Sequence, residues 1–337
     1  MSALAASHPT LLDLAKRLDP DGKIDVIAEI LTQENPILED MNFVEGNLPT
    51  GHRTTIRTGL PTPTWRKLYG GVQPTKSNTA QVTDSCGMLE AYAEVDKALA
   101  DLNGNTAAFR LSEDRAHIEG MAQELASTII YGNEGDQPEA FTGLAPRYNS
   151  LSAANADNIV SAGGTGSDNT SIWLVVWGDQ TLHGIYPKGS RAGLDMQDKG
   201  QVTIENVDGS GGRMEAYRTH YRHDCGLTVR DWRFAARVCN IDVSALTSDG
   251  TAADRAAAQK ALINFMVQAS ERIPSLSKGR AVWYVNRTIR EQLRLGIIEK
   301  IAGNLAWETV SGKRVMTFDD IPVKRLDAIN NTEARVV

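Results

Sequence analysis

Residues 46–83 restrict what this chain can fold into more than any other part of the sequence. The stretch is rich in Thr, Gly and Pro and contains no Asp or Glu. Segments Thr54–Thr58 and Thr64–Leu68 flank a turn at Gly59–Pro63, a pattern that predicts two strands of a long β-hairpin. Its apolar residues are too sparse to stabilise such a hairpin alone, so we expect it to need a partner surface. Its basic residues are Arg53, Arg57, Arg66, Lys67 and Lys76.

The segment before this hairpin has the opposite charge. Residues 11–45 contain nine acidic side chains and only three basic ones, within short helical patterns that have few apolar residues to pack on one another. Complementary charge on two extended elements favours contact between copies of the chain, where charge sets the register. The alternative is two solvated segments of opposite sign, and the residues alone leave both open.

A long helix is predicted from Thr106 to Tyr131. Apolar residues recur along one stripe of it, and Gly132 is a typical C-terminal stop. At 1.5 Å per residue this helix is about 39 Å long. Gly120 costs about 1 kcal/mol relative to Ala inside a helix, so we expect it to mark a point of close packing.

The remainder of the chain mixes strands and helices without regular alternation, which predicts an α+β fold. The continuous apolar run Ser171–Trp177 predicts a buried strand, and a capping box at Thr251–Asp254 opens a helix that Pro274 ends. Asn286 is placed to cap a helix over 287–295. Further strands are expected at 182–186, 202–207, 214–222, 232–241, 281–285 and near 321–323.

Charge and cysteine usage narrow the functional classes. The net charge of −7 argues against a surface that wraps nucleic acid tightly. Cys86, Cys225 and Cys239 are too sparse and too few for a disulfide framework, so buried free thiols in a reducing compartment are expected. No signal-peptide pattern opens the sequence, and no apolar run approaches the ~18 residues of a membrane span, so we expect a protein made in the cytoplasm.

Few patterns suggest chemistry. His220, His223 and Cys225 carry zinc-ligand groups, but strand alternation puts 220 on the opposite face and no fourth ligand is evident. The Gly163–Ser167 run lacks the Lys and the helix of a phosphate loop. Cys86 has no histidine at a spacing that indicates a nucleophile pair, and alternating aromatics near Tyr217 are more typical of sheet packing than of base stacking. We therefore expect no enzyme activity, no cofactor and no metal.

Several segments, in this order, resemble the gp7-type major capsid proteins of podovirus-like and related tailed phages, whose fold is HK97-like. The resemblance extends over nearly the whole chain, and the order of the segments is more specific than any one of them. The segments are Thr55–Pro61, Trp65–Lys67, Gly71–Ser77, Glu90–Lys97, Gly226–Phe234 with Asn240–Asp242, and Ile321–Val323 through Asp327–Ile329.

The resemblance implies a division of the chain. Residues 1–45 are then an N-terminal arm, 46–83 an extended hairpin (the E-loop) that lies over a neighbouring subunit, and 84–132 a peripheral domain with the spine helix. Residues 133–317 are mostly the axial domain, and 318–337 a C-terminal strand and tail. Segment 226–242 also suits a strand of the peripheral domain, so strand connectivity permuted relative to the prototype stays open.

The implied function is a major capsid protein that forms hexamers and pentamers of an icosahedral phage head around double-stranded DNA. Its implied partners are further copies of itself, a portal, a separate scaffolding protein, a cement or decoration protein, and DNA held weakly without sequence preference. No motif carries over the prototype's covalent cross-link. The alternatives are an encapsulin-like nanocompartment shell, and a soluble hydrolase or phosphate-binding enzyme.

Candidate interface residues follow from the hairpin and from the acidic segments that could receive it. The hairpin residues expected to contact a neighbouring subunit are Arg53, Arg57, Leu60, Trp65, Arg66, Lys67, Tyr69 and Lys76. The candidate acidic counterparts are Asp25, Glu29, Glu39, Asp40, Glu113, Asp114 and Glu119.

Overall fold

The computed structural model describes residue 9 and residues 33–104, 106–205, 211–247, 252–298, 305–310 and 313–337. The helical pattern expected between residues 10 and 32, with Asp25 and Glu29, lies outside the described residues. The chain divides into two compact units. Unit 1 contains Met1–Gln33, Met88–Ala126 and Arg191–Asp224, and unit 2 contains Glu34–Gly87, Ser127–Ser190 and Cys225–Val337.

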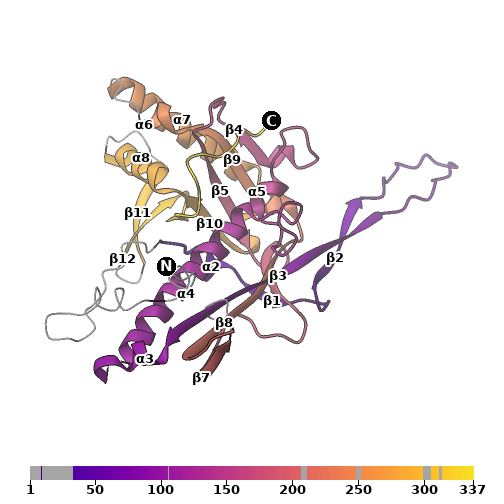
Figure 1. Cartoon of the computed structure of the whole chain (residues 1–337). Helices are drawn as coiled ribbons and strands as arrows, with labels where there is room; N and C mark the ends of the chain where they lie inside the picture. The colour runs from indigo at the N-terminus through magenta and orange to yellow at the C-terminus, as the bar shows by residue number, and fades with distance from the viewer. Residues whose placement is uncertain are drawn as a thin grey trace. The chain divides into compact units, whose positions relative to one another are not determined.

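Strand β5 (Asn169–Trp177) is the centre of unit 2 (Figure 1). All nine of its residues are buried, which confirms the buried strand predicted from the continuous apolar run. It pairs antiparallel with β9 (Ala235–Asp242) on one side and with β10 (Arg280–Val285) on the other. Both neighbours bring apolar side chains such as Val238 and Trp283 into the same core.

The sheet of unit 2 continues outward from both neighbours of β5. Strand β9 pairs parallel with β4 (Ile159–Ser161), and β10 pairs parallel with β13 (Ile321–Arg325). An antiparallel ladder then joins β13 to β12 (Lys313–Phe318) and β12 to β11 (Leu305–Val310). Parallel and antiparallel pairs thus occur in one sheet, as an α+β chain predicts.

The other end of the sheet of unit 2 is built around β6 (Leu182–Tyr186). Trp177 of β5 pairs with Leu182, β1 (Phe43–Glu45) pairs parallel with β6, and residues 226–229 of β8 pair antiparallel with it. Gly184 is required where β1 passes, because a Cβ there would lie 2.8 Å from the Phe43 ring.

Helices of unit 2 follow signals in the sequence. Helix α7 (Ala252–Glu271) packs against β9 and β4, and α8 (Arg287–Ile298) packs against α7. The Asn286 side chain accepts a 2.8 Å hydrogen bond from the Ile289 backbone N–H, so the predicted cap of α8 is confirmed. The shorter helical elements are α2 (Ile37–Asp40), α5 (Leu144–Arg147), α6 (Val243–Thr247), η3 (Ala156–Asn158), η4 (Trp232–Phe234) and η5 (Leu276–Lys278).

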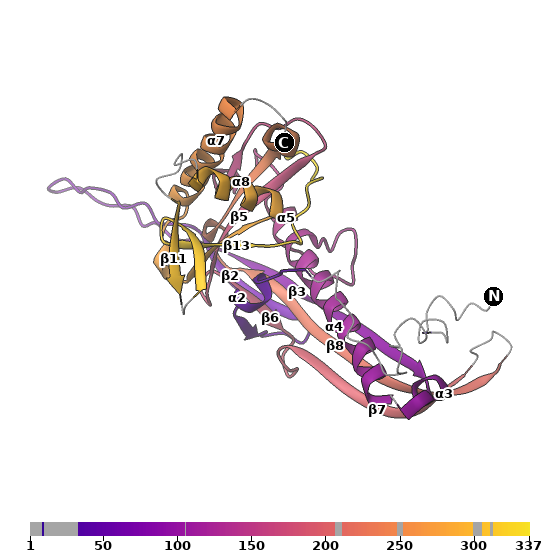
Figure 2. The ribbon, with the colours of Figure 1, turned by 90° about the vertical axis from the view of Figure 1, so that its left-hand side faces the viewer.

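Unit 1 is a helix on a sheet. Strand β7 (Leu194–Glu205) pairs antiparallel with β8 (Arg213–Val229), and β8 pairs with β3 (Asn78–Asp96). Helix α4 (Thr106–Tyr131) has the bounds predicted from the sequence and lies along these strands (Figure 2). Ala93, Met121 and Tyr221 form one core cluster, and Val95, Ala100 and Phe109 form another. Two short elements precede α4, α3 (Lys97–Ala100) and η2 (Leu102–Gly104).

The hairpin of residues 46–83 belongs to unit 2 and differs from its prediction in one strand. Strand β2 (Gly51–Gly59) pairs with the first part of β3, from Gly51↔Ser85 to Gly59↔Asn78. The second strand expected at Thr64–Leu68 is wrong, because residues 60–77 contain no strand. Three prolines within 60–77 cannot donate a backbone hydrogen bond, so the returning strand of the ladder begins only at Asn78.

Candidate subunit interface

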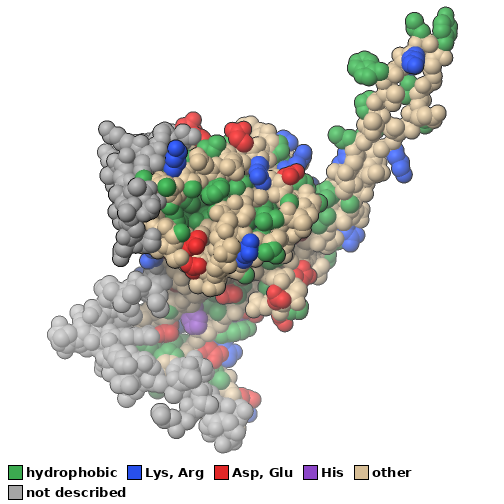
Figure 3. Space-filling model, turned by 90° about the horizontal axis from the view of Figure 1, so that it is seen from above, with side chains coloured by type: hydrophobic (Ala, Val, Ile, Leu, Met, Phe, Trp, Pro, Cys, Tyr) green, Lys and Arg blue, Asp and Glu red, His purple; other side chains and the backbone are tan. Residues whose placement is uncertain are grey.

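The tip of the hairpin exposes large apolar side chains. Trp65 and Tyr69 are essentially fully accessible, and Leu60 and Leu68 are 77% and 88% exposed. Figure 3 shows hydrophobic side chains in green and Lys or Arg side chains in blue along the hairpin. Single exposed apolar residues are ordinary on a protein surface, but a concentration of this kind marks an interaction site.

Few hydrogen bonds shape the loop that carries these side chains. The Gly70 N–H donates to the Lys67 carbonyl at 3.0 Å, and the Thr75 hydroxyl donates to the Thr62 carbonyl at 3.4 Å. Tyr69 has a positive φ of 61°, a backbone conformation that non-glycine residues adopt mainly in tight turns. The turn at Lys67–Gly70 therefore directs Leu68 and Tyr69 outward.

The base of the hairpin is held firmly, in contrast to its tip. The Asn47 side chain and the Arg53 backbone exchange two hydrogen bonds of 2.7 Å each. The Cys86 N–H donates to the Thr50 carbonyl at 2.9 Å, and Arg147 forms a 2.8 Å ion pair with the buried Asp84. A rigid base aims the tip, so the apolar side chains are presented at a defined place.

The predicted basic residues all lie on this hairpin and are exposed. The Arg53 guanidinium donates to the Thr83 hydroxyl across the β2–β3 ladder at 3.2 Å. Across the described ranges of the chain, none of the other four forms an ion pair; these are Arg57, Arg66, Lys67 and Lys76. Their charge is available to a second molecule.

The acidic candidates are placed differently from one another. Asp40 is buried, and its carboxylate is paired with Lys324 at 2.5 Å and with Arg280 at 2.7 Å, so it does not present charge to a neighbour. Glu39 is exposed beside it. The Glu119 carboxylate accepts a 3.0 Å hydrogen bond from the Gln33 backbone and a 2.7 Å bond from the Gln123 amide.

The last two acidic candidates, Glu113 and Asp114, are half-buried on α4. They lie in unit 1, whereas the hairpin lies in unit 2. Asp114 raises the pKa of the neighbouring Tyr221 hydroxyl, although burial of that hydroxyl is the larger cause.

The sequence patterns considered as a zinc site and as a phosphate loop lie in ordinary elements of the fold. His220 stacks on Tyr92 with 4.5 Å between ring centroids, and its Nε2 lies 3.2 Å from a Glu90 oxygen. Among the residues that the structure describes, no three His, Cys, Asp or Glu side chains are grouped to hold a metal. The Gly163–Ser167 run is a loop between β4 and β5, folded back where the Asn169 amide donates to the Gly166 carbonyl at 2.7 Å.

The other two candidates for a functional site, the alternating aromatics and Cys86, belong to strands of the sheets. Tyr221 lies in the core under α4, and the Cys86 side chain is half-buried at the base of the hairpin. No described helix is both long and apolar enough to cross a membrane.

Comparison with known proteins decides the family. Residues 19–337 match the family described as "Major capsid protein GP7". This chain belongs to the GP7 family of major capsid proteins. The capsid protein also matches the solved structure of bacteriophage Epsilon15 with a TM-score of 0.77 and 41% identity, covering 100% of this chain and 99% of that one. No curated protein matches it.

More distant solved structures align less well with the capsid protein. A native gene-transfer-agent (GTA) capsid gives a TM-score of 0.46 at 12% identity over 71% of this chain and 98% of that one. The SrpI encapsulin of Synechococcus elongatus PCC 7942 gives 0.44 at 14% identity over 72% and 99%. Similarity at this level carries no functional argument, so the family match and the Epsilon15 match favour the phage capsid over the encapsulin alternative.

The chain is thus a phage major capsid protein of mixed α+β, HK97-like fold, a structural component of the virion that assembles with copies of itself into a shell. The anchor of the hairpin at Asp84 and Arg147 was not predicted from the sequence. Asp84 is the first acidic residue after the acid-free stretch, which is a usable signal, whereas Arg147 lies 63 positions further on with no pattern linking the two.

Proposed function

We propose that the hairpin of residues 46–83 is the E-loop by which each subunit binds its neighbour in the phage head. The observation that carries this proposal is the tip: Trp65 and Tyr69 are wholly accessible on a loop without a single acidic residue. Such a surface is unfavourable in an isolated molecule and becomes favourable when a second copy covers it.

The apolar side chains supply most of the binding energy in this proposal. An exposed ion pair contributes about 0–1 kcal/mol, whereas full burial of a large apolar side chain contributes about 1.5–3 kcal/mol. Trp65, Leu68 and Tyr69 are therefore the anchors, and the basic residues set the orientation and the rate of encounter.

The assembled product we propose is an icosahedral head of hexamers and pentamers around double-stranded DNA. Repeated heterologous contacts between identical subunits produce closed rings and then a closed shell. With a net charge of −7, the protein holds DNA weakly and without sequence preference. A portal, a separate scaffolding protein and a cement protein complete the particle, which is assembled in the host cytoplasm.

The division of the chain that accompanies this proposal is an arm at 1–45, the E-loop at 46–83, a peripheral domain at 84–132 with α4 as its spine helix, a mostly axial domain at 133–317, and a C-terminal strand and tail at 318–337. The E-loop assignment is supported by the exposed tip, and the spine helix by the length and position of α4.

The proposal is tested by removing one anchor and by reversing one charge. Trp65→Ala and Arg57→Glu leave the fold of the soluble subunit intact, because both side chains are exposed, and we expect neither variant to form shells. Met196→Ala and Lys199→Glu, on the exposed strand β7, are the matched controls and should assemble normally. Circular dichroism checks the fold, and electron microscopy checks the particles. Intact particles from both hairpin variants would contradict the proposal.

A further inference from the structure

The base of the hairpin contains a contact between two histidines, both in unit 2. Strands β3 and β8 separate β2 from β6 in the order of the sheet, yet β2 and β6 lie against each other. His52 of β2 and His183 of β6 meet edge to face, with 5.9 Å between their ring centroids. Among the described residues no backbone hydrogen bond joins β2 to β6, so side chains make this contact.

Polar atoms without a hydrogen-bond partner are concentrated around this contact. Within the described part of the chain, these atoms are Nδ1 of His52, Nδ1 of His183, Oδ2 of Asp84 and Oγ1 of Thr228. His52 lies directly opposite Asp84 in the β2–β3 ladder, and His183 lies opposite Thr228 in the β6–β8 ladder. Most buried polar groups in folded proteins are hydrogen-bonded, so a cluster of exceptions requires a physical explanation.

The surroundings of both rings oppose protonation. Burial is the largest cause for each ring, and the positive charge of Arg230 acts in the same direction; the pKa of His183 falls to about 4, and that of His52 is also lowered. Asp84 favours a charged His52 and Asp179 favours a charged His183, but both effects are outweighed. The closed contact between the rings therefore accepts only their neutral forms.

We propose that this contact is an acid-sensitive joint of the hairpin: a protonated His52 leaves His183 and donates from Nδ1 to Oδ2 of Asp84, which separates β2 from β6. The acceptor is available because Arg147 is paired with Oδ1 of the same carboxylate, at 2.8 Å. The charged ring gains a charge-assisted hydrogen bond and moves away from the positive charge of Arg230. The base of the hairpin is thus an element with two arrangements, and pH shifts the balance between them.

The segment that enters β2 supplies a pivot for this movement. The Gly46 N–H donates to the Tyr186 carbonyl at 2.8 Å, and the Lys188 N–H donates to the Leu48 carbonyl at 3.2 Å. These bonds involve no titratable side chain, so they hold the chain beside the end of β6 at either pH. Strand β2 runs on into the hairpin, and a rotation at its first residues therefore changes the direction of the tip. This joint acts whether or not the hairpin binds a neighbouring subunit.

The distance between two spin labels on the unassembled subunit tests the joint. Thr58→Cys places one label on an exposed position of β2, and Ser152→Cys places the other on an exposed loop of the same unit. Cys86→Ser removes the half-buried thiol, and Cys225 and Cys239 are buried. Pulsed electron paramagnetic resonance should give a narrow distance distribution at pH 7 and a broader, shifted one at pH 4.5. Circular dichroism checks that the subunit stays folded at both values.

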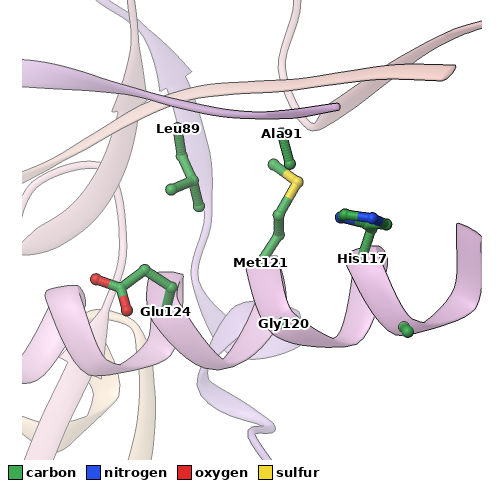
Figure 4. A pocket seen from close by; sticks show the side chains of 7 residues that line it. Leu89, Ala91, His117, Gly120, Met121 and Glu124 are labelled. Atoms are coloured by element: carbon green, nitrogen blue, oxygen red, sulfur yellow. The ribbon is translucent and has the colours of Figure 1, made fainter. Parts of the chain in front are cut away.

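Two substitutions of His52 separate the joint from other effects of acid. His52→Gln cannot be protonated, so its distribution should stay narrow at pH 4.5. His52→Arg carries a charge at both pH values and can reach Asp84, so it should show the broad distribution already at pH 7. The control is His117→Gln, which removes a histidine of unit 1 that lies beside a groove with Leu89 and Met121 (Figure 4). It should respond to acid as the labelled parent does.

Either of two results overturns the inference. One is a narrow distribution at pH 7 for a folded His52→Arg subunit, and this comparison decides alone if the parent unfolds at pH 4.5. The other is a His52→Gln distribution that broadens in acid as much as that of the parent. Because the subunit is unassembled in these measurements, both results leave the proposed function intact, whereas normal shells from Trp65→Ala would contradict the proposed function and leave the joint intact.

Discussion

Asp84 and Arg147 form an ion pair at the base of the hairpin, with 2.8 Å between the Asp84 Oδ1 and the Arg147 Nη2. The Asp84 side chain is 3% exposed, and the same guanidinium also donates to the Thr142 and Leu227 carbonyls at 3.2 Å. One arginine thus joins strand β3 to strand β8 and to the segment before α5. This fixed base determines the direction of the tip.

Removal of Arg147 should weaken that base. Arg147→Met keeps most of the side chain's volume but leaves the Asp84 carboxylate buried without its partner, which costs about 1–3 kcal/mol of unfolding free energy. Urea denaturation of the unassembled subunit measures it. Arg233→Met removes the partner of Asp231 at a site where the arginine is 54% exposed, and should change stability by less than about 1 kcal/mol. Equal effects of the two substitutions would contradict the anchoring role.

The second prediction concerns the ion pair between Arg237 and Glu333, a residue of the C-terminal tail. Both side chains are 4% exposed and 2.9 Å apart, and the Tyr131 hydroxyl donates to the same carboxylate at 2.5 Å. Glu333→Gln leaves a buried guanidinium without a counter-charge and should cost about 3–5 kcal/mol. Arg237→Met with Glu333→Leu removes both charges and should recover part of that loss. A double variant no more stable than Glu333→Gln would show that the charge pair is not the cause.

Two histidines at the hairpin base predict a dependence on pH. Burial, together with the positive charges of Arg230 and His52, lowers the pKa of His183 to about 4. The pKa of His52 is also lowered, mainly by burial. The two rings meet edge to face at 5.9 Å between centroids. In the unfolded chain a histidine is protonated near pH 6.5, whereas His183 in the folded chain is protonated only near pH 4. The contribution of the neutral ring to the free energy of unfolding is therefore complete above about pH 6.5 and is lost toward pH 4.

The melting temperature between pH 7 and pH 5 measures this contribution. The melting temperature of wild type should decrease more over this interval than that of His183→Gln, because glutamine cannot be protonated. The control is Glu90→Gln, which removes the partner of a different histidine, His220, and leaves His183 unchanged. Its melting temperature should fall between pH 7 and pH 5 as much as that of wild type. An identical pH profile for wild type and His183→Gln would show that His183 does not titrate in this range.

The sequence was most informative where a pattern was local. Helix α4 begins and ends where its apolar stripe and Gly132 predicted, and β5 lies where a run of seven apolar or small residues required burial on both faces. Local patterns do not say what lies opposite a residue. At Gly120, where close packing was expected, a Cβ atom meets no described atom within 4 Å, so that packing is not found among the described residues.

Long-range pairing accounts for the other differences. Asp40 was assigned to an acidic surface because its neighbours in sequence are acidic, yet Arg280 and Lys324, more than 200 positions away, enclose it in the core. The hairpin was predicted correctly as an extended basic element, but its returning strand was placed within the proline-containing tip. The returning strand could be located only from the residues that pair with β2, the first of which along the chain is Asn78.

Salt should slow assembly without dismantling finished shells. The hairpin is uniformly basic and the chain as a whole carries a net charge of −7, so charge accelerates the encounter between copies. This steering weakens as the Debye length falls from about 10 Å at 0.1 M to about 3 Å at 1 M. Once the tip is buried, its apolar contacts are screened little. Light scattering should show a lower assembly rate in 1 M NaCl than in 0.1 M, while preformed particles keep their size. Lys67→Gln with Lys76→Gln should be slower than wild type at 0.1 M and less sensitive to salt, and an assembly rate that rises with salt in both proteins would rule out electrostatic steering by the hairpin.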